Sequence, residues 1–280
     1  MLVPTEELSR HLADPAWVVF DCRHDLMDHA RGLKMYREGH IPGAHFAAVE
    51  TDLAAAKTGR NGRHPLPTPQ AFADFLGLHG VSEGSMIVAY DDSGGLYSMR
   101  LWWMARWIGH AQVAVLDGGF QKWVAEGRAL EHSEPPTKPT KLIATPNPGM
   151  VWSAADVAAR MSRPDCVVVD ARTPERFRGE SEPIDPVAGR IPGAVNRPYK
   201  QNLKADLTFR APGELCAEFS TLIGGRSPEN VGHTCGSGVT ACANLFAMEY
   251  AGLKGSKLYA GSWSEWIADP ARPVGKGPAT

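Results

Sequence analysis

Short runs of β-branched and aromatic residues alternate along this chain with longer segments whose apolar residues recur at helical spacing. The runs that predict strands lie at 17–20, 86–90, 113–116, 166–169, 230–234 and 257–260. The segments that predict helices lie at 5–12, 68–78, 101–108, 120–126, 153–161, 211–222 and 239–251. This alternation is typical of an α/β fold in which a parallel sheet is covered by helices.

The pattern occurs twice, because three short motifs recur in the same order in the second half. Ile41-Pro-Gly-Ala44 returns as Ile191-Pro-Gly-Ala194, Asp21-Cys-Arg23 as Asp170-Ala-Arg172, and the segment 116–123 as 258–266. The separation between the copies changes only by loop-sized amounts, so we infer a tandem duplication. The repeat also supports the strand at 230–234, where Val231 is the only strong β-former, because its counterpart at 86–90 is strongly β-forming.

A proline-rich segment separates the two copies. Residues 131–149 contain five prolines, which prevents a regular helix and favours an extended, stiff connector. We therefore predict an N-terminal domain at 1–134, a linker at 135–149 and a C-terminal domain at 150–280. Each predicted domain has the size of an ordinary small domain.

Cys235 lies at the end of a predicted strand and just before a predicted helix. Gly236 and Gly238 allow successive backbone N–H groups to turn inward and form an anion-binding nest, and the helix N-terminus adds positive potential. This setting favours a thiolate, which is the nucleophilic form of cysteine. The corresponding segment of the first copy, 91–97, has no cysteine. We therefore expect one reactive domain, with the other forming a wall of the cleft.

Composition narrows the choice of partners and compartment. A net charge of −2 and a pI near 6.6 give no reason to expect nucleic acid or an anionic membrane as a partner. The chain starts without a signal-peptide pattern and has no apolar run long enough to cross a bilayer. Five cysteines without a disulfide-like pattern favour a reducing, cytoplasmic location. No Cys/His group has zinc-site spacing, so we expect neither a metal nor another cofactor.

The motifs together resemble the tandem-rhodanese sulfurtransferases over nearly the whole chain. The resemblance rests on both Ile-Pro-Gly-Ala motifs, Asp170-Ala-Arg-Thr-Pro-Glu-Arg-Phe-Arg-Gly179, Asp117-Gly-Gly-Phe-Gln-Lys-Trp123 and Cys235-Gly-Ser-Gly-Val-Thr240. The last segment is similar to the loop of the 3-mercaptopyruvate branch. The thiosulfate branch typically carries arginine and lysine directly after the cysteine, where this chain has Gly236 and Ser237.

The resemblance implies an α/β protein of two tandem rhodanese-like domains, each a parallel sheet flanked by helices. It also implies a double displacement in which Cys235 takes sulfur from 3-mercaptopyruvate as a persulfide, releases pyruvate and passes the sulfur to cyanide or a thiol. Thioredoxin or a small thiol fits the family as acceptor. Thiosulfate is a dianion and leaves as the dianion sulfite, so a loop without basic side chains favours mercaptopyruvate instead.

The resemblance further implies roles for single residues. Ser237 would protonate the leaving enolate and form a relay with His64 and a carboxylate, which aligns best with Glu50 and almost as well with Asp52. Arg176 would hold the substrate carboxylate through its guanidinium fork. The family's second carboxylate-binding arginine falls at Asp185 in this chain, and Arg178 is the candidate replacement. The predicted contacts with the transferred sulfur come from the loop backbone at Gly236, Gly238, Val239 and Thr240.

Three other functions remain open from the sequence. A thiosulfate sulfurtransferase would share the mechanism and differ only in its donor. A non-catalytic rhodanese-like binding module would need an unreactive Cys235. A phosphatase of the Cys-x5-Arg type is disfavoured, because Ala241 stands where the phosphate-gripping arginine would be.

Overall fold

The computed structural model describes residues 1–278, which divide into two compact units. The first unit comprises Met1–Ala55, Leu66–Asn147 and Leu203–Phe209. The second comprises Ala56–Pro65, Pro148–Asn202 and the chain from Arg210 onward. The segment predicted as a linker forms no helix or strand before the 3-10 turn η1 (Pro148–Met150), and its residues up to Asn147 group with the first unit.

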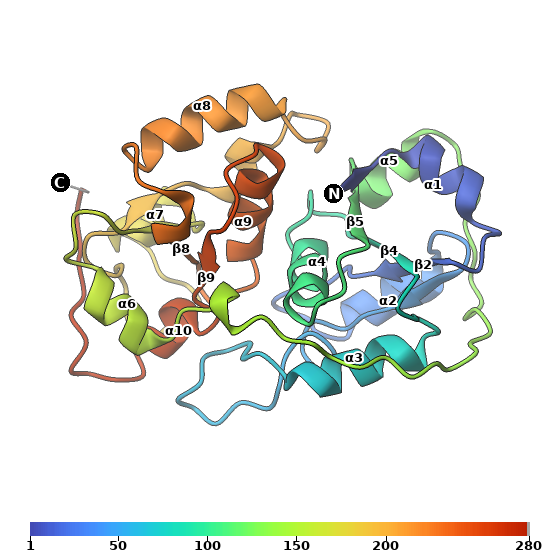
Figure 1. The fold of residues 1–280 in the computed structure, drawn as a ribbon, viewed down its shortest axis with the longest axis horizontal. Helices are drawn as coiled ribbons and strands as arrows, with labels where there is room; N and C mark the ends of the chain where they lie inside the picture. Colours follow the sequence, from blue (N-terminus) through green and yellow to red (C-terminus); the bar gives the residue numbers. More distant parts are fainter. Residues whose placement is uncertain (279–280) are drawn as a thin grey trace. The chain divides into compact units, whose positions relative to one another are not determined.

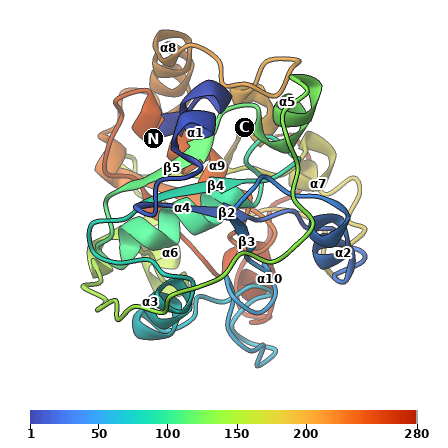
Figure 2. The same cartoon turned by 90° about the vertical axis from the view of Figure 1, so that its right-hand side faces the viewer.

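The first unit is built around a five-stranded parallel sheet with the strand order β1-β5-β4-β2-β3. Its strands are β1 (Leu2–Val3), β2 (Trp17–Asp21), β3 (Ala44–Phe46), β4 (Met86–Tyr90) and β5 (Val113–Leu116). Its helices are α1 (Thr5–His11), α2 (Arg31–Glu38), α3 (Pro69–Leu78), α4 (Ser98–Trp107) and α5 (Gly119–Ala125). Figure 2 shows α1 and α5 on one face of this sheet and α3 and α4 on the other.

Alternating side chains explain why both faces of the first sheet are covered. Val88 and Tyr90 of β4 join the apolar cluster that contains Leu8 of α1 and Trp123 of α5. Ile87 and Ala89, which alternate with them on the strand, are equally buried and point to the opposite face. Strands covered on both faces have near-continuous apolar sequences, as the sequence of β4 illustrates.

The second unit has a four-stranded parallel sheet with the strand order β7-β6-β8-β9. Its strands are β6 (Val167–Asp170), β7 (Val195–Asn196), β8 (Val231–Thr234) and β9 (Lys257–Leu258). Its helices and 3-10 turns after η1 are α6 (Ala154–Arg160), α7 (Pro174–Arg178), η2 (Tyr199–Asn202), α8 (Pro212–Leu222), η3 (Pro228–Asn230), α9 (Ala241–Tyr250) and α10 (Ser262–Trp266). In Figure 1, α8 and α9 lie on one side of the strands of this unit and α6 and α10 lie on the other.

Local sequence fixes several element boundaries in the second unit. Ser153 caps α6 through a capping box with Asp156. The Ser153 hydroxyl accepts from the Asp156 N–H, and the Asp156 carboxylate accepts from the Ser153 N–H. Pro212 occupies the first turn of α8, where its missing N–H costs nothing. Trp152, Trp263 and Trp266 pack with β6 and α6 in one apolar cluster, so these tryptophans belong to the core of the second unit.

The duplication is visible in a buried ion pair at the end of β2 in the first unit and at the end of its counterpart β6 in the second. Asp21 forms a bidentate pair with Arg23, whose Nη2 also donates to the carbonyl of Gly39 at 2.7 Å. In the second unit, Arg172 pairs with Asp170 in the same way and donates to the carbonyl of Gly189 at 2.8 Å. Each pair therefore ties the end of a strand to the loop before the Ile-Pro-Gly-Ala turn.

Asp170→Ala should strongly destabilise the protein, because the side chain of Arg172 is only 1% exposed and would lose its main partner. Breaking a buried ion pair from one side costs about 3–5 kcal/mol. Urea unfolding would measure the loss. Asp165→Ala is the matched control, because the Arg163–Asp165 pair is exposed and contributes little. Equal unfolding midpoints for the two variants would contradict this account.

Among the described residues, no helix has both the length and the apolar character required to cross a membrane.

Candidate active site

Cys235 lies directly after β8, and its side chain is almost fully enclosed, with the residue 2% exposed. The Gly238 N–H donates to the Cys235 sulfur at 3.1 Å. The backbone of Cys235 is held on both sides, because its N–H donates to Ser262 Oγ at 3.1 Å and its carbonyl accepts from Trp263 N–H at 3.0 Å. The loop therefore presents the sulfur to an inward-pointing backbone donor.

Two glycines make the loop conformation possible. Gly238 has a φ of +79°, and a Cβ atom there would lie 2.1 Å from the carbonyl oxygen of Ala260. A Cβ at Gly236 would lie 2.9 Å from Arg63 Nη2 and 3.5 Å from Arg176 Nη2. Gly236 therefore leaves the space in which two guanidinium groups approach the loop, while Gly238 permits the turn itself.

The last two predicted loop residues occupy the start of α9. Val239 is buried, and Thr240 is the N-cap residue of the helix. Thr240 has helical backbone angles, and its side chain makes no capping hydrogen bond. Cys242 is buried inside the unit, and its thiol donates to the Gly238 carbonyl at 3.4 Å.

His64 and Ser237 are brought together within the second unit. His64 Nδ1 lies 2.7 Å from Ser237 Oγ, and the two residues are only 2% and 6% exposed. His64 belongs to the segment Ala56–Pro65, which comes from the N-terminal half of the sequence but groups with the second unit. The segment is fixed there by the Arg63 N–H, which donates to Ser264 Oγ at 2.9 Å.

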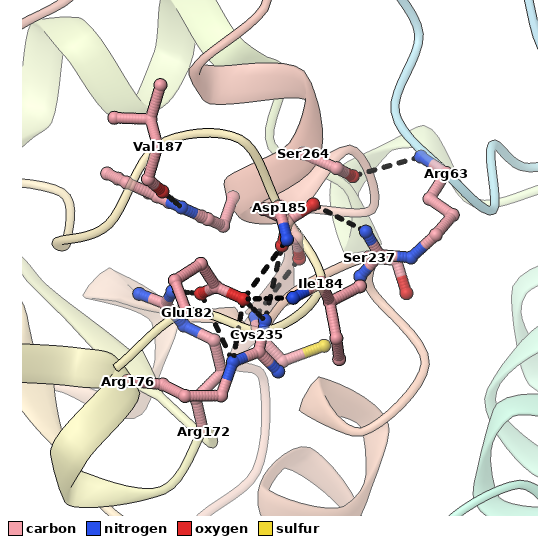
Figure 3. Close-up of polar contacts among 12 residues, drawn as sticks. Arg63, Arg172, Arg176, Glu182, Ile184, Asp185, Val187, Cys235, Ser237 and Ser264 are labelled. Carbon is pink, nitrogen blue, oxygen red and sulfur yellow. Dashed lines mark hydrogen bonds and ion pairs between the residues drawn. The ribbon is translucent and has the colours of Figure 1, made fainter. Parts of the chain in front are cut away.

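A cluster of charged side chains surrounds the loop (Figure 3). Arg176 pairs with Glu182 at 2.6 Å and also contacts Asp185 at 3.2 Å. Arg63 forms a close ion pair with the same Asp185. Arg172 reaches Glu182 at 3.3 Å in addition to its own partner. The guanidinium groups next to the loop are therefore held in place by buried carboxylates.

The charges within this cluster shift the pKa values of two of its members, Glu182 and Arg172. Burial alone would raise the pKa of Glu182, but hydrogen bonds from Arg176 and from the Asp185 N–H outweigh it and lower that pKa. The pKa of Arg172 is raised although its burial acts in the opposite direction, because Asp170, Glu182 and the charge of Cys235 favour the guanidinium. Both shifts favour the charged forms of Glu182 and Arg172, and Arg172 lies within electrostatic reach of the sulfur.

The loop has no basic side chains of its own, but two guanidinium groups from other segments approach it. The residues after Cys235 are neutral in sequence, but Arg63 and Arg176 approach Gly236 in space. Arg63 was missed because its position depends on where the segment Ala56–Pro65 packs, and no local pattern reveals that packing. The only sequence signal was its place next to the predicted histidine.

The contacts recorded for Arg178 and Glu50 are with other residues. The Arg178 guanidinium pairs with Glu180 at 2.7 Å on the surface. Glu50 belongs to the first unit, where its Oε1 atom lies 3.6 Å from His29 Nε2 and 3.9 Å from His24 Nε2. Asp52 accepts a hydrogen bond from the Ala48 N–H at 2.7 Å. A pairing of His64 with Glu50 or Asp52 stays a prediction.

Comparisons with known proteins agree with the duplicated architecture. The family described as "Rhodanese-like domain" matches residues 4–126 and again residues 153–269. A "Probable 3-mercaptopyruvate sulfurtransferase" of Pseudomonas aeruginosa is 45% identical over 278 residues, covering 99% of this chain and 98% of the relative. A "Putative thiosulfate sulfurtransferase SseB" of Mycobacterium tuberculosis is 37% identical, covering 90% of this chain and 89% of the relative.

Solved structures show the same fold. The crystal structure of SseA from Escherichia coli, described as showing the fold of 3-mercaptopyruvate sulfotransferases, has a TM-score of 0.80 and 30% identity over 94% of this chain and 98% of its own. The 3-mercaptopyruvate sulfurtransferase of Leishmania major has a TM-score of 0.82 and 30% identity over 95% of this chain and 74% of its own. With both halves matched and relatives similar over nearly their full length, this chain belongs to the rhodanese family of sulfurtransferases and carries two rhodanese-like domains.

Proposed function

We propose that this protein transfers sulfur from 3-mercaptopyruvate, through a persulfide on Cys235, to a thiol or cyanide, and releases pyruvate. The observation that carries this proposal is the 2.7 Å contact between His64 Nδ1 and Ser237 Oγ, two residues from the nucleophile. A hydroxyl with an imidazole behind it can deliver a proton, which the enolate leaving group requires and sulfite does not.

In the first half-reaction the Cys235 thiolate attacks the sulfur of mercaptopyruvate. A sulfur–sulfur bond forms while the carbon–sulfur bond breaks, and its electron pair moves onto the three-carbon fragment as the enolate of pyruvate. The Ser237 hydroxyl lies beside the loop to protonate that enolate, and His64 would replace the proton. Backbone N–H groups of the loop, including that of Gly238, stabilise the negative charge on sulfur.

The substrate carboxylate would bind to Arg63 and Arg176, the guanidinium groups that approach Gly236. Arg63 would thus take the part expected of the family's second arginine, whose position here is held by Asp185. Glu182 and Asp185 hold both side chains in position before substrate arrives. Such preorganisation reduces the entropy lost on binding.

The same two arginines also support a second candidate donor. Thiosulfate carries two negative charges, and two guanidinium groups near the sulfur could bind it. The donors differ in their need for a proton, so Ser237 distinguishes them. Ser237→Ala should lower kcat/KM for mercaptopyruvate by about 10²- to 10⁴-fold and leave thiosulfate turnover nearly unchanged.

Kinetics with both donors would test the proposed function. We expect kcat/KM for mercaptopyruvate to exceed that for thiosulfate in the wild type, with pyruvate formed in proportion to sulfur transferred. A higher value for thiosulfate, together with equal losses for both donors in Ser237→Ala, would overturn the assignment and favour the second candidate.

Arg63→Met should raise KM for mercaptopyruvate, because a charged hydrogen bond to the carboxylate is lost. The expected cost of about 1.5–3 kcal/mol corresponds to about a tenfold to hundredfold increase. Steady-state kinetics would measure it, with Arg178→Met as the comparison, since Arg178 already pairs with Glu180 at the surface. If Arg178→Met raised KM and Arg63→Met did not, the sequence-based assignment of Arg178 would be correct instead.

The proposed acceptor is a thiol such as thioredoxin or a small molecule, and the proposed location is the cytoplasm. All five cysteines are free thiols, which suits a reducing compartment. Persulfide transfer to an acceptor thiol also requires that compartment to keep the acceptor reduced.

A further inference from the structure

We propose that His24, His29 and Glu50 form a binding site for a divalent transition metal ion in the first unit. One ligand atom from each residue lies within 4.8 Å of the other two. Glu50 Oε1 is 3.6 Å from His29 Nε2 and 3.9 Å from His24 Nε2. The two imidazole rings lie 5.5 Å apart between centroids. The three groups thus converge on one point.

The state of His24 supplies an independent indication of a ligand. Its side chain is only 4% exposed, and its Nε2 atom is buried without a hydrogen-bond partner. Leaving a buried polar nitrogen unsatisfied costs free energy, so such atoms normally have a partner. This nitrogen faces the Glu50 carboxylate at a distance too long for a hydrogen bond. A metal ion bound between the two groups would give the His24 nitrogen the partner that it lacks.

The fold explains why these residues meet. His24 follows β2 and Glu50 follows β3, and the two strands are neighbours in the parallel sheet, with Asp21 opposite Phe46. The carboxyl ends of adjacent parallel strands bring their following loops together. His29 lies in the turn before α2, where Ala30 N–H donates to Asp28 and Met27 N–H donates to Asp25. That turn directs His29 back toward His24.

The ligand set selects the class of metal. Two imidazoles and one carboxylate suit zinc and neighbouring ions such as cobalt or nickel, whereas calcium and magnesium prefer oxygen ligands alone. Zinc bonds of about 2.0–2.1 Å place tetrahedral ligands about 3.3 Å apart, so the two measured separations need to contract by only a few tenths of an ångström. The side chain of His29 is 50% exposed, which leaves an entry path and room for water as a further ligand.

Sequence spacing did not reveal this group, and the expectation of no metal rested on spacing alone. His24 and Glu50 are far apart in the chain, and only the pairing of β2 with β3 brings them together. The proposal does not depend on the proposed sulfur transfer.

Titration calorimetry of the full-length, metal-depleted protein with zinc would test the site. We expect one tight equivalent in the wild type and at least about a tenfold weaker Kd in His29→Ala, which loses one of three protein ligands. His29 is half exposed, so this variant should fold normally, and an unchanged melting temperature without metal would verify it. His29→Asp should restore part of the affinity, while His132→Ala removes another exposed histidine and should bind as the wild type does.

Cobalt separates this site from binding at the reactive cysteine. The proposed ligands give a visible spectrum without a sulfur-to-cobalt charge-transfer band, and the spectrum should survive in Cys235→Ser. Absence of binding, unchanged affinity in His29→Ala, or loss of the tight equivalent in Cys235→Ser would each overturn the proposal. None of these outcomes depends on turnover, so failure of the metal site and failure of the proposed function are distinguishable.

Discussion

Cys235→Ser is expected to reduce sulfur transfer from every donor by at least about a thousandfold, because the step that forms the covalent intermediate is lost. A serine hydroxyl is a far weaker nucleophile toward sulfur than a thiolate. The fold should be retained, since the exchange keeps the shape of a side chain that is already enclosed. Mass spectrometry after incubation with donor would show one added sulfur on Cys235 in the wild type and none in the variant.

Cys216→Ser is the matched control for this experiment. Cys216 is partly exposed on α8, so it is accessible to donor but has no glycine-rich loop around it. Its replacement should leave both turnover and persulfide formation unchanged. If the added sulfur appeared on another cysteine, or if Cys235→Ser kept substantial turnover, the assignment of the nucleophile would be wrong.

Gly238→Ala should have the second-largest effect, because it disrupts both the turn and the backbone donor to sulfur. An alanine at a φ of +79° costs about 1–2 kcal/mol, and its Cβ would meet the Ala260 carbonyl oxygen at 2.1 Å. The loop must shift to relieve this contact, and the Gly238 N–H then moves away from Cys235 Sγ. Loss of one such donor typically lowers kcat by about 10²–10³-fold. Single-turnover pyruvate release would measure the loss.

Gly213→Ala provides a glycine substitution without these consequences. Gly213 lies in the first turn of α8, and no atom lies within 4 Å of a Cβ built there. Alanine at such a helical position should keep or slightly raise stability. Wild-type persulfide formation in Gly238→Ala would refute the proposed role of the loop backbone.

The apolar pattern predicted the parallel sheets and most of the helices, because buried strands and amphipathic helices carry the strongest periodic signals. The strands β4 and β5 have the predicted bounds, and α1, α3 and α8 differ by one residue at one end. The strand predicted at 257–260 is shorter, since only Lys257–Leu258 pairs with β8. The weakly β-forming segment of β8 is a strand, as its repeat partner indicated.

The elements that the pattern missed are short or depend on tertiary contacts. They are β1, β3, β7, α2, α7 and α10. β1 and β7 contain two residues each and exist only through pairing with a longer neighbour. α10 begins at Ser262, whose φ of +51° is unusual for a residue with a side chain, and it is held by bonds to the carbonyls of the Cys235 loop. Local propensity does not report such constraints.

The candidate site also contains residues that the sequence could predict and residues that it could not. Cys235 and its glycines were predictable from a strand, a turn and a helix in succession, and the contact of Ser237 with His64 follows the family resemblance. Arg63 was not predictable, because its role depends on how the segment Ala56–Pro65 packs. The surface pair between Arg178 and Glu180 likewise depends on side-chain geometry that one sequence does not specify.

The packing of Ala56–Pro65 against the second unit has a consequence for the history of the gene. A polypeptide that began at Pro148 would keep the thiol and its glycine-rich turn, yet it would lack both the imidazole at position 64 and the guanidinium at position 63. If His64 and Arg63 act as proposed, the first copy needs no cysteine of its own but cannot be deleted, because it encodes two side chains of the site. Selection would preserve the fused gene for this reason, and separation into two single-domain proteins would inactivate the copy that carries Cys235.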